Sequence, residues 1–553
     1  MKHKEIYSLG CGKGLATKGR LRSSVATVAG TLLCLGGGLA ATTAQADDED
    51  FGVNLSGYVR TIVATSLSDH PETASNDKWD IPMARGTVYL DLDVFTGPLT
   101  WKAVGRFDKE VKTGYLKNLE ALTQLQSPGG NFSDDFMDQY DTSNVWEFLR
   151  EFYVDFTLFD RLDVRLGKQQ LVWGESDFFQ AMDLIHGFDY RWRLFFENNE
   201  DWRKPLVLAN FNLDVSEWDG ALNFFIRPGL DRAEDMGSNF NLEGGRWIPH
   251  PYRGVDFTAF NTAYNTDHNR GDWDDVTFGA RWTGSLGSIG YSLAYLKTFN
   301  PAPIVNPATI GNLGVLEAFG VTSTTPYGEV ASNQVLGDWI YPKIDVFGAS
   351  VNGFVSALDA TLSAEVAFTP NKPFNFGQLE SSLPGWGGIV EKDTLAIMLR
   401  VDKELKLSEW LGTNRPSLSS IQLFDTWIVD YESSNDVVEF FSFGAPKKKH
   451  TVYLTAFTLL NFKHDTINPS FVIGGDLSNG GGFLIPAVEF VMGDNWRVKF
   501  EADLWWGGDK KQPSAALESG AHLNPLGISE NSASFFDWFA KDNQLVVKVT
   551  RQF

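Results

Sequence analysis

The last nine residues of the chain, Leu545–Phe553, alternate between apolar and polar side chains. One side of this stretch carries Leu545, Val547, Val549 and Phe553, and the other carries Lys548, Thr550 and Gln552. Successive side chains of a β-strand point to opposite faces, so the alternation predicts a strand with one apolar and one polar face. The fold must therefore place the apolar face in an apolar environment and the polar face among polar groups or water.

The terminal strand ends on an aromatic residue, Phe553. In this it is similar to the closing strands by which Gram-negative outer-membrane barrels are recognised for insertion. Arg551 departs from that pattern, because it shares the apolar face. At the edge of a membrane its long side chain can carry the charge out to the headgroups. The alternative interpretation is an edge strand of a soluble sandwich.

The same period of two recurs along most of the chain. Hairpins are predicted at 87–108, 146–171 and 275–298, where two alternating stretches flank a short turn. Further strands are predicted at 52–67, 344–352, 358–368, 394–402, 419–429, 451–460, 466–473, 484–492 and 496–506, with weaker periodicity at 205–214 and 218–227. The pattern predicts an all-β fold, a single transmembrane antiparallel β-barrel of about 16 to 18 strands, because single-chain bacterial barrels favour even numbers.

The joins between these strands fall into two classes. Phe159–Arg161 and Gly284–Gly287 are tight, whereas long joins lie at 109–144, 228–274, 300–341, 371–392, 430–449 and 507–543. Such barrels have short periplasmic turns and long outer loops, so we expect the long joins to be extracellular. Because they are aromatic and acidic, some should fold over the mouth or into the lumen. Residues 191–203 could be an amphipathic element or ordinary loop packing.

Residues 1–46 are predicted to be a cleaved secretory signal, with the barrel at 47–553. A basic region precedes a short apolar run, Val25–Leu39, and Ala44-Gln45-Ala46 is a cleavage signature. The run is shorter than a comfortable membrane-spanning helix. Lipidation at Cys34 is the alternative, but Leu33 stands where a small residue is expected.

Composition excludes several classes of function. Both cysteines, Cys11 and Cys34, lie in the signal, so no disulfide or thiolate site is expected after export. Without the signal the chain has 41 basic and 69 acidic residues, a formal net charge of −28, which argues against a nucleic-acid partner. Eighteen Trp and 42 Phe without a long apolar run fit a barrel with aromatic girdles.

From Trp146 to Asp189 the chain resembles a family of proteobacterial outer-membrane barrels known as domain of unknown function 1302. The residues that carry the likeness are Leu149-Arg150-Glu151-Phe152-Tyr153, Arg165 to Ser176, and Asp183-Leu184-Ile185 with Asp189. The family commonly shows Asn-Pro where this chain has His186-Gly187. Weaker likeness continues to the terminus.

The resemblance implies an outer-membrane location and a role in transport across the envelope. Proteins of this family look like partners of resistance-nodulation-division (RND) type transporters and of periplasmic companions, with hydrophobic or lipid-like cargo. Outer-membrane lipid and the barrel assembly machinery are the other partners expected. The family brings no residue-level mechanism.

The central motif has its own physical interpretation. Gly167 and Gly174 allow a bend or a close backbone approach. Lys168 and Gln169 break the alternation, as in a bulge. The stretch is either a structural corner or part of a passage or docking surface. The candidate residues for that surface are Arg165, Gln169, Trp173, Glu175 and Asp183.

Charged side chains on the polar phase of the strands are expected to face the lumen. The main candidates are Glu151, Asp155, Arg400, Arg497, Lys499 and Glu501, with Asp163, Asp359, Glu365, Asp402 and Asp503 beside them. Mixed signs suggest ion pairs between neighbouring strands. These charges either stiffen and solvate the wall or line a polar passage.

No catalytic, cofactor or metal site is expected. Ser478-Asn479-Gly480 has Asp476 where a phospholipase barrel would have His, so a turn is the better explanation. The histidines show no metal-binding spacing. Two acidic runs, Asp47–Asp50 and Asp272–Asp275, could bind calcium but do not match a calcium loop, so solvated surface is favoured.

We therefore expect a transport barrel for hydrophobic or lipid-like molecules that works with inner-envelope partners. One alternative is a diffusion porin, which an open lumen with an arginine-rich constriction would favour and a plugged lumen would not. The other is a structural or adhesive barrel whose long loops bind partners.

Overall fold

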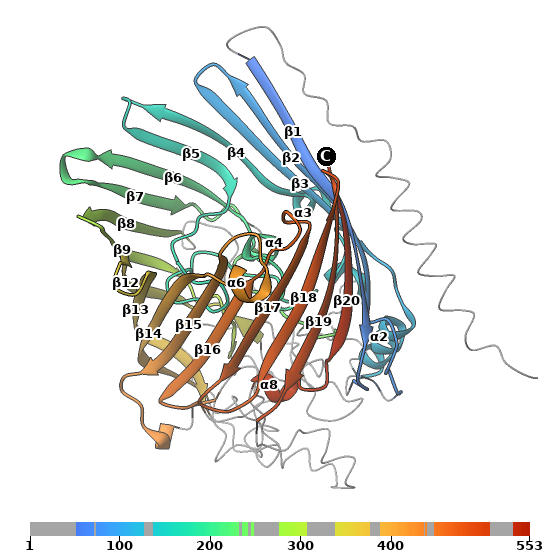
Figure 1. Ribbon diagram of the computed structural model, residues 1–553. Coiled ribbons are helices and arrows are strands. Elements are labelled where there is room, and N and C mark those ends of the chain that lie inside the picture. Colours follow the sequence, from blue (N-terminus) through green and yellow to red (C-terminus); the bar gives the residue numbers. More distant parts are fainter. Residues whose placement is uncertain are drawn as a thin grey trace, which may run out of the picture.

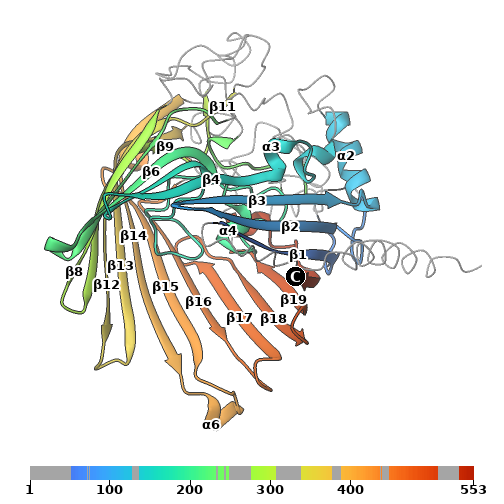
Figure 2. The same ribbon diagram turned by 90° about the horizontal axis from the view of Figure 1, so that it is seen from above.

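Eighteen strands form one antiparallel sheet that closes on itself in the computed structural model (Figures 1 and 2). Each wall strand pairs with the next, β9 pairs with β12, and β20 pairs with β1. The structure describes residues 51–70, 73, 75–126, 136–231, 235–241, 245–247, 276–306, 338–376, 388–435, 437–438, 447–508 and 535–553. The predicted single barrel is confirmed, with a strand number at the top of the expected range.

The wall strands are β1 (Phe51–Ser66), β2 (Met83–Thr96), β3 (Leu99–Glu110), β4 (Leu149–Leu158), β5 (Leu162–Gln169), β6 (Leu206–Val215), β7 (Gly220–Arg227), β8 (Thr277–Leu286), β9 (Ile289–Phe299), β12 (Lys343–Val355), β13 (Ala360–Phe376), β14 (Gly388–Leu405), β15 (Ser417–Ile428), β16 (His450–Leu459), β17 (Ile467–Asp476), β18 (Gly482–Met492), β19 (Trp496–Trp506) and β20 (Gln544–Gln552). A separate two-stranded sheet joins β10 (Ile304–Asn306) to β11 (Asp338–Ile340).

Helices occupy only short stretches of the described chain. They are α2 (Gly114–Gln126), η1 (Phe136–Gln139), α3 (Val145–Phe148), α4 (Asn199–Trp202), η2 (Ser216–Trp218), α6 (Ser408–Leu411), η6 (Ser433–Asn435) and α8 (Phe535–Trp538). Among the described residues, no helix is both long enough and apolar enough to cross a bilayer.

The alternation of each strand sets which side chains face out. On β19, Trp496 and Phe500 fall on the outer phase, and the register pairs inward-facing Lys499 with Lys548 of β20. Apolar residues of the outer phase, such as Phe500 and Leu545, are exposed, as lipid contact requires. Arg551 is also on this face, where its guanidinium lies 5.7 Å from the Trp496 ring centroid.

The two ends of the barrel differ. At the short-turn end, which also holds both termini of the wall, hairpins such as β4–β5 and β6–β7 turn back within a few residues (upper left of Figure 1). At the long-loop end lie α2 and α8 (bottom of Figure 1) and every long connection. The predicted division into tight and long joins is therefore confirmed.

Three boundaries were wrong. The strand expected from Trp146 begins at Leu149, because Asn144 caps α3 by accepting a hydrogen bond from the Glu147 amide at 3.0 Å. The join 371–392 is shorter, since β13 and β14 continue through a register shift between Thr369 and Lys372. The turn placed at Gly284–Gly287 lies at 287–288, because β8 runs to Leu286.

Asp359 was also misplaced. It lies in the exposed turn before β13 with φ of +49°, and so it is not a wall residue. The predicted signal (1–46) and the two acidic runs that could bind calcium lie outside the described residues.

Closure of the barrel brings Phe553 against Gly57 of β1. The Gly57 amide donates to the Phe553 carbonyl at 3.1 Å, and the Phe553 amide donates back at 3.0 Å. A Cβ at Gly57 would stand 2.2 Å from the Tyr89 carbonyl oxygen and 2.9 Å from the Phe553 ring. This seam therefore tolerates no side chain.

We predict that Gly57→Val destabilises the barrel by about 1 to 3 kcal/mol, since the added atoms overpack the seam. The measurement is the temperature at which the folded, fast-migrating species on a denaturing gel is lost. Gly114→Ala is the matched control, because nothing lies within 4 Å of a Cβ there. Equal transition temperatures for the two variants would contradict the prediction.

Candidate functional site in the lumen

The connection between β5 and β6, residues 170–205, folds into the barrel and is called here the inner segment. Both views draw it, in green, inside the ring of strands (Figures 1 and 2). It contains one short helix, α4, and is otherwise irregular. Its backbone is held largely by the wall, so its path is fixed by contacts with residues far away in the sequence.

The first half of the inner segment contacts the wall from β7 to β15. Trp173 Nε1 donates to Asn223 of β7 at 2.9 Å. Asn352 of β12 donates to Glu175 Oε1 at 3.0 Å. Two residues on, Gln422 of β15 donates to Asp177 at 2.8 Å. The contacts thus advance along the wall as the chain advances.

The second half continues in the same direction. The Phe179 ring stacks on Tyr453 of β16 with centroids 4.4 Å apart. Arg193 pairs with Asp503 of β19 at 3.2 Å, and Lys548 of β20 donates to Glu197 at 2.6 Å. Arg60 of β1 and Arg106 of β3 then bind Asp201, and Arg150 of β4 donates to the Arg203 carbonyl at 2.7 Å.

The inner segment therefore makes a circuit of the wall, from β7 by way of β20 and β1 to β4. A loop that hung into the lumen from one side would contact only adjacent strands. A circuit narrows the lumen from all round and anchors the segment at many points. The inner segment is therefore the candidate functional site.

Arg193 is the most deeply buried of these anchors. Its guanidinium meets Glu197 of its own segment at 2.9 Å, and Glu501 and Asp503 of β19. Burial opposes ionisation of Glu197, but Lys548 and Arg193 outweigh it and lower the pKa of that carboxyl to about 2. Asp503 is compensated by Arg193, and Glu501 is shared between Arg193 and Lys499 of its own strand.

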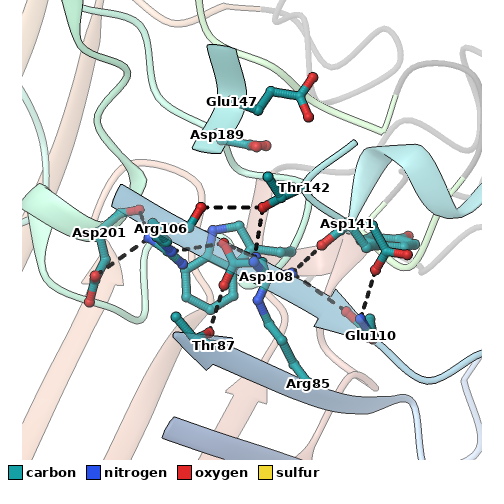
Figure 3. A network of polar contacts seen from close by, with 12 residues as sticks. Arg85, Thr87, Arg106, Asp108, Glu110, Asp141, Thr142, Glu147, Asp189 and Asp201 are labelled. Carbon is teal, nitrogen blue, oxygen red and sulfur yellow. Dashed lines mark hydrogen bonds and ion pairs between the residues drawn. The ribbon is translucent and has the colours of Figure 1, made fainter. Parts of the chain in front are cut away.

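A second polar network surrounds Asp108 of β3 (Figure 3). The Asp108 carboxylate forms ion pairs with Arg106 at 2.8 Å and with Arg85 of β2 at 2.9 Å. The Thr87 hydroxyl donates a hydrogen bond to the same carboxylate at 2.6 Å. Trp192 of the inner segment stacks near both guanidinium groups, at 4.6 Å from Arg85 and 5.1 Å from Arg106. The network joins the inner segment to the wall opposite β12–β15.

The five residues proposed from the central motif do not form one cluster. Gln169 is fully buried and donates to the Leu208 carbonyl at 3.0 Å, and Arg165 pairs with Asp155 of β4 at 2.7 Å. Trp173 and Glu175 anchor the inner segment to the wall, as described above. Asp183 pairs with Arg203 inside the segment, and burial raises the pKa of its carboxyl.

The glycines of the motif behave as close-approach positions. A Cβ at Gly167, where φ is +134°, would stand 2.2 Å from the Phe152 carbonyl oxygen. A Cβ at Gly174 would stand 2.8 Å from the Asp183 Cβ. The motif thus forms the corner at which the chain leaves the wall and enters the lumen.

Apart from Asp359, the charges proposed to face the lumen lie on the inward phase of their strands, and each of the six main candidates has a polar partner. Gln170 donates to Glu151 at 2.9 Å, and Arg400 binds Asp402 and Asp177. The remaining pairs are Arg165–Asp155, Arg497–Glu489, Lys499–Glu501 and Arg193–Glu501.

Sequence reasoning missed the circuit. The long joins it identified did not include 170–205, and Arg193, Glu197 and Asp201 were not proposed as functional. The signal that could have found them is the density of aromatic and charged residues in a stretch flanked by two strands. The amphipathic element considered at 191–203 is instead irregular chain that ends in α4.

Ser478 lies in the tight turn between β17 and β18. Asp476 accepts hydrogen bonds from the Ser478 and Asn479 amides at 2.8 and 2.9 Å, and the Ser478 hydroxyl accepts from Val452 at 2.8 Å. These contacts support the interpretation as a turn. Within the described chain, no group of three or more acidic, His or Cys side chains is placed to hold a metal ion.

We predict that Arg193→Met frees the inner segment from β19. Buried Asp503 would lose its cation and Glu501 would keep only Lys499, at a cost of about 3 to 5 kcal/mol. The measurement is protease cleavage within 170–205 in the folded barrel. Arg191→Met is the control, because Arg191 pairs with Asp189 of its own segment and is partly exposed. Equal protection in both variants would rule out the anchoring role.

We also predict that low pH loosens the inner segment through His186. Its buried ring accepts the Leu171 amide at 2.8 Å and lies 2.8 Å from the Lys204 carbonyl. Burial, helped by Arg203, lowers its pKa to about 3. A lowered pKa means that the stability is present above the unfolded value near 6.5 and is lost as pH falls toward 3.

Hydrogen exchange of residues 170–205 measures this loss, expected at about 1.4 kcal/mol for each pH unit below 6.5. His186→Asn should flatten the profile. His450→Gln should not, since His450 is half exposed on β16 and pairs with Asp425. An unchanged profile in His186→Asn would contradict the assignment.

Known proteins provide one family match and several distant structural likenesses. No curated protein is detectably similar in sequence. Among solved structures, OccAB1 of Acinetobacter baumannii has 11% identity and a TM-score of 0.42, with 93% of this chain and 99% of that chain covered. The outer-membrane channel DcaP of A. baumannii has 9% identity and a TM-score of 0.37, covering 93% and 100%.

An anion-selective porin from Comamonas acidovorans has 10% identity and a TM-score of 0.35, covering 91% of this chain and 100% of that one. Likeness at this level says nothing about what this chain transports. The family model described as "Protein of unknown function (DUF1302)" matches residues 27–527. The chain therefore belongs to the DUF1302 family, and its fold is that of an outer-membrane β-barrel.

Proposed function

We propose that this protein is an outer-membrane channel in which the inner segment narrows the lumen and selects the solutes that pass. The circuit of residues 170–205 is the observation that carries the proposal. Because the segment is anchored to strands on all sides, a passage in this barrel would be bounded by the segment as well as by the wall. Such a passage would act by geometry and electrostatics, without covalent chemistry.

The charges of the lumen support small polar solutes as the cargo. Lysines and arginines of the wall are matched by nearby carboxylates, as in Arg165–Asp155, Arg400–Asp402 and Lys102–Asp91. Paired charges keep a surface hydrated but create little net field. We therefore expect weak discrimination between cations and anions, and a size limit set by the inner segment.

A second candidate is passage of hydrophobic molecules, in concert with an RND-type transporter and periplasmic companions. The observation that favours it is an aromatic cluster between the inner segment and the wall. Phe195 and Phe196 pack there against Phe483 of β18, Trp505 of β19 and Phe536 of α8. Phe195, Phe483 and Trp505 are buried in this cluster, so apolar cargo would contact them once the inner segment moved away from β18 and β19.

Reconstitution tests the proposal. The purified barrel in planar bilayers should give discrete conductance steps, and vesicles that contain it should swell in small sugars or amino acids. Replacing residues 176–182 by a short Gly-Ser linker should raise the conductance several-fold, since it removes the contacts with β15 and β16. The matched control replaces 461–465, which lie in the turn after β16.

A silent wild-type barrel and a silent shortened barrel would together refute the channel. Conductance only in the shortened barrel would mean that the inner segment closes the lumen at rest. Co-purification of an apolar molecule, lost when Phe196 and Trp505 are replaced by Ser, would move the assignment to the second candidate.

A further inference from the structure

Large apolar side chains are exposed at the tips of five consecutive hairpins at the short-turn end. They are Phe159 (84% exposed), Trp218 (75%), Leu286 (72%), Leu358 (52%) and Trp410 (87%), in the turns β4–β5, β6–β7, β8–β9, β12–β13 and β14–β15. We call this set the apolar arc. Exposed apolar patches of this kind mark interaction sites on folded proteins.

The other turns of the short-turn end have less exposed apolar side chains. In the turns β2–β3, β16–β17 and β18–β19, residues 97–98, 460–466 and 493–495 include no exposed large apolar side chain, and Leu459 (42%) and Met492 (51%) at the strand ends beside them are less exposed than Phe159, Trp218 or Trp410. Their tips are Gly97-Pro98, Lys463-His464-Asp465 and Gly493-Asp494-Asn495. A bilayer surrounds a barrel on every side, so contact with lipid alone predicts apolar tips on the whole ring.

The wall already has interfacial aromatics behind the apolar arc. Trp282 of β8 and Tyr291 of β9 lie on the outer face, with the indole N–H donating to the Tyr291 hydroxyl at 3.1 Å. Such outward Trp and Tyr are typical of the girdle at a membrane interface. Leu286 lies beyond them, at the end of β8, and Trp218 lies in the adjacent turn.

Acidic residues flank the apolar tips. Asp160 follows Phe159, Glu217 and Asp219 enclose Trp218, Asp359 follows Leu358, and Glu409 precedes Trp410; all five acidic residues are exposed. Arg161 lies 3.7 Å from Glu217, and Lys406 lies 3.9 Å from Asp359. The five carboxylates outnumber these two cations, so a surface of anionic phospholipid would repel the excess negative charge. A protein with an apolar face bordered by Lys and Arg would match both the apolar tips and their charged flanks.

Phe159 supplies a further argument. Phe159 and Asp160 both have φ of +56°, the left-handed region, in the three-residue turn that joins Leu158 to Leu162. Asn and Gly adopt that region at the lowest cost, and a bulky aromatic residue does so at a cost in strain. An exposed phenylalanine at such a position contributes nothing to the hairpin itself, so its value lies in what it contacts.

We propose that the apolar arc is a docking surface for a periplasmic protein whose binding face is apolar with a basic border. This rests on the proposed function, because it assumes that the short-turn end of the barrel faces the periplasm, as in other outer-membrane barrels. The docking proposal adds to the proposed function the position of the binding surface and the chemistry of the partner's binding face. A partner seated there would cover the side of the barrel mouth from β4 to β15.

The test uses cross-linking from defined positions in the intact outer membrane. Because the only cysteines of the chain, Cys11 and Cys34, lie in the expected signal, one engineered thiol can carry a benzophenone label. Trp218→Cys and Trp410→Cys report on the apolar arc. His464→Cys and Asn495→Cys are the matched controls on the opposite turns.

We expect both arc positions to cross-link to one and the same periplasmic protein, with less than about a tenth of that yield at the control positions. The captured protein, once purified, should bind the reconstituted barrel. The triple variant Phe159→Ser, Trp218→Ser, Trp410→Ser should weaken that binding at least about tenfold. Added salt should weaken it as well, because the flanking charges contribute.

Cross-links to lipid alone, to a second copy of this chain, or equally from both sets of positions would overturn the proposal, and so would no cross-link at all. The conductance of the triple variant keeps the two proposals apart. Unchanged conductance with lost docking supports both. A wild-type barrel and a shortened barrel that are both silent refute the channel whatever the cross-linking shows.

Discussion

Closure of the sheet is the constraint on which the rest of this structure depends. In a bilayer no water is present to satisfy backbone N–H and C=O groups, so a sheet can span it only without free edges. The pairing of β20 with β1, sealed by the two hydrogen bonds between Gly57 and Phe553, removes the last edges. Every strand can then point its apolar side chains outward. Because side chains alternate, its polar side chains must point into the lumen.

The inner segment provides partners for the charged side chains that face the lumen. A wall with Glu501, Asp503 and Glu365 facing inward would carry uncompensated buried charge if loops covered it without matching groups. The inner segment brings Arg193 to the first two and two backbone amides to Glu365, at 2.9 and 2.6 Å. Its route round the lumen follows the places where the wall offers a partner.

The contacts that hold the inner segment also bear on the proposed function. Anchors on opposite sides of the barrel hold the inner segment, whose only regular element is α4, by ion pairs and hydrogen bonds as well as by packing. On the side of β16 to β19 the contacts are aromatic, with Phe483 and Trp505 packed against Phe195 and Phe196. Polar and apolar contacts together therefore fix the position of the segment that would bound a passage.

The sequence by itself determined the class of fold, because a period of two reads directly onto the faces of a strand. It predicted the wall, the two kinds of join and the inward phase of Glu151, Arg400 and Lys499. The sequence-based prediction was wrong at Trp146, which lies in the capped helix α3, and at Asp359, which lies in a turn. A period of two does not reveal either feature. The glycines at 167 and 174 were predicted as close-approach positions from their place in the motif alone.

Only the tertiary structure decided what fills the barrel. The wall partners of Arg193, Glu501 and Asp503, are 308 and 310 residues away in the sequence, and those of Asp201, Arg60 and Arg106, are 141 and 95 residues away. No period or motif in 170–205 indicates these wall partners. The apolar arc is likewise invisible along the chain, where Phe159, Trp218 and Trp410 are isolated aromatics in separate turns. Closing the sheet places these turns side by side, because each hairpin pairs with the next one round the barrel. Turns that are far apart in the sequence therefore become neighbours at one end.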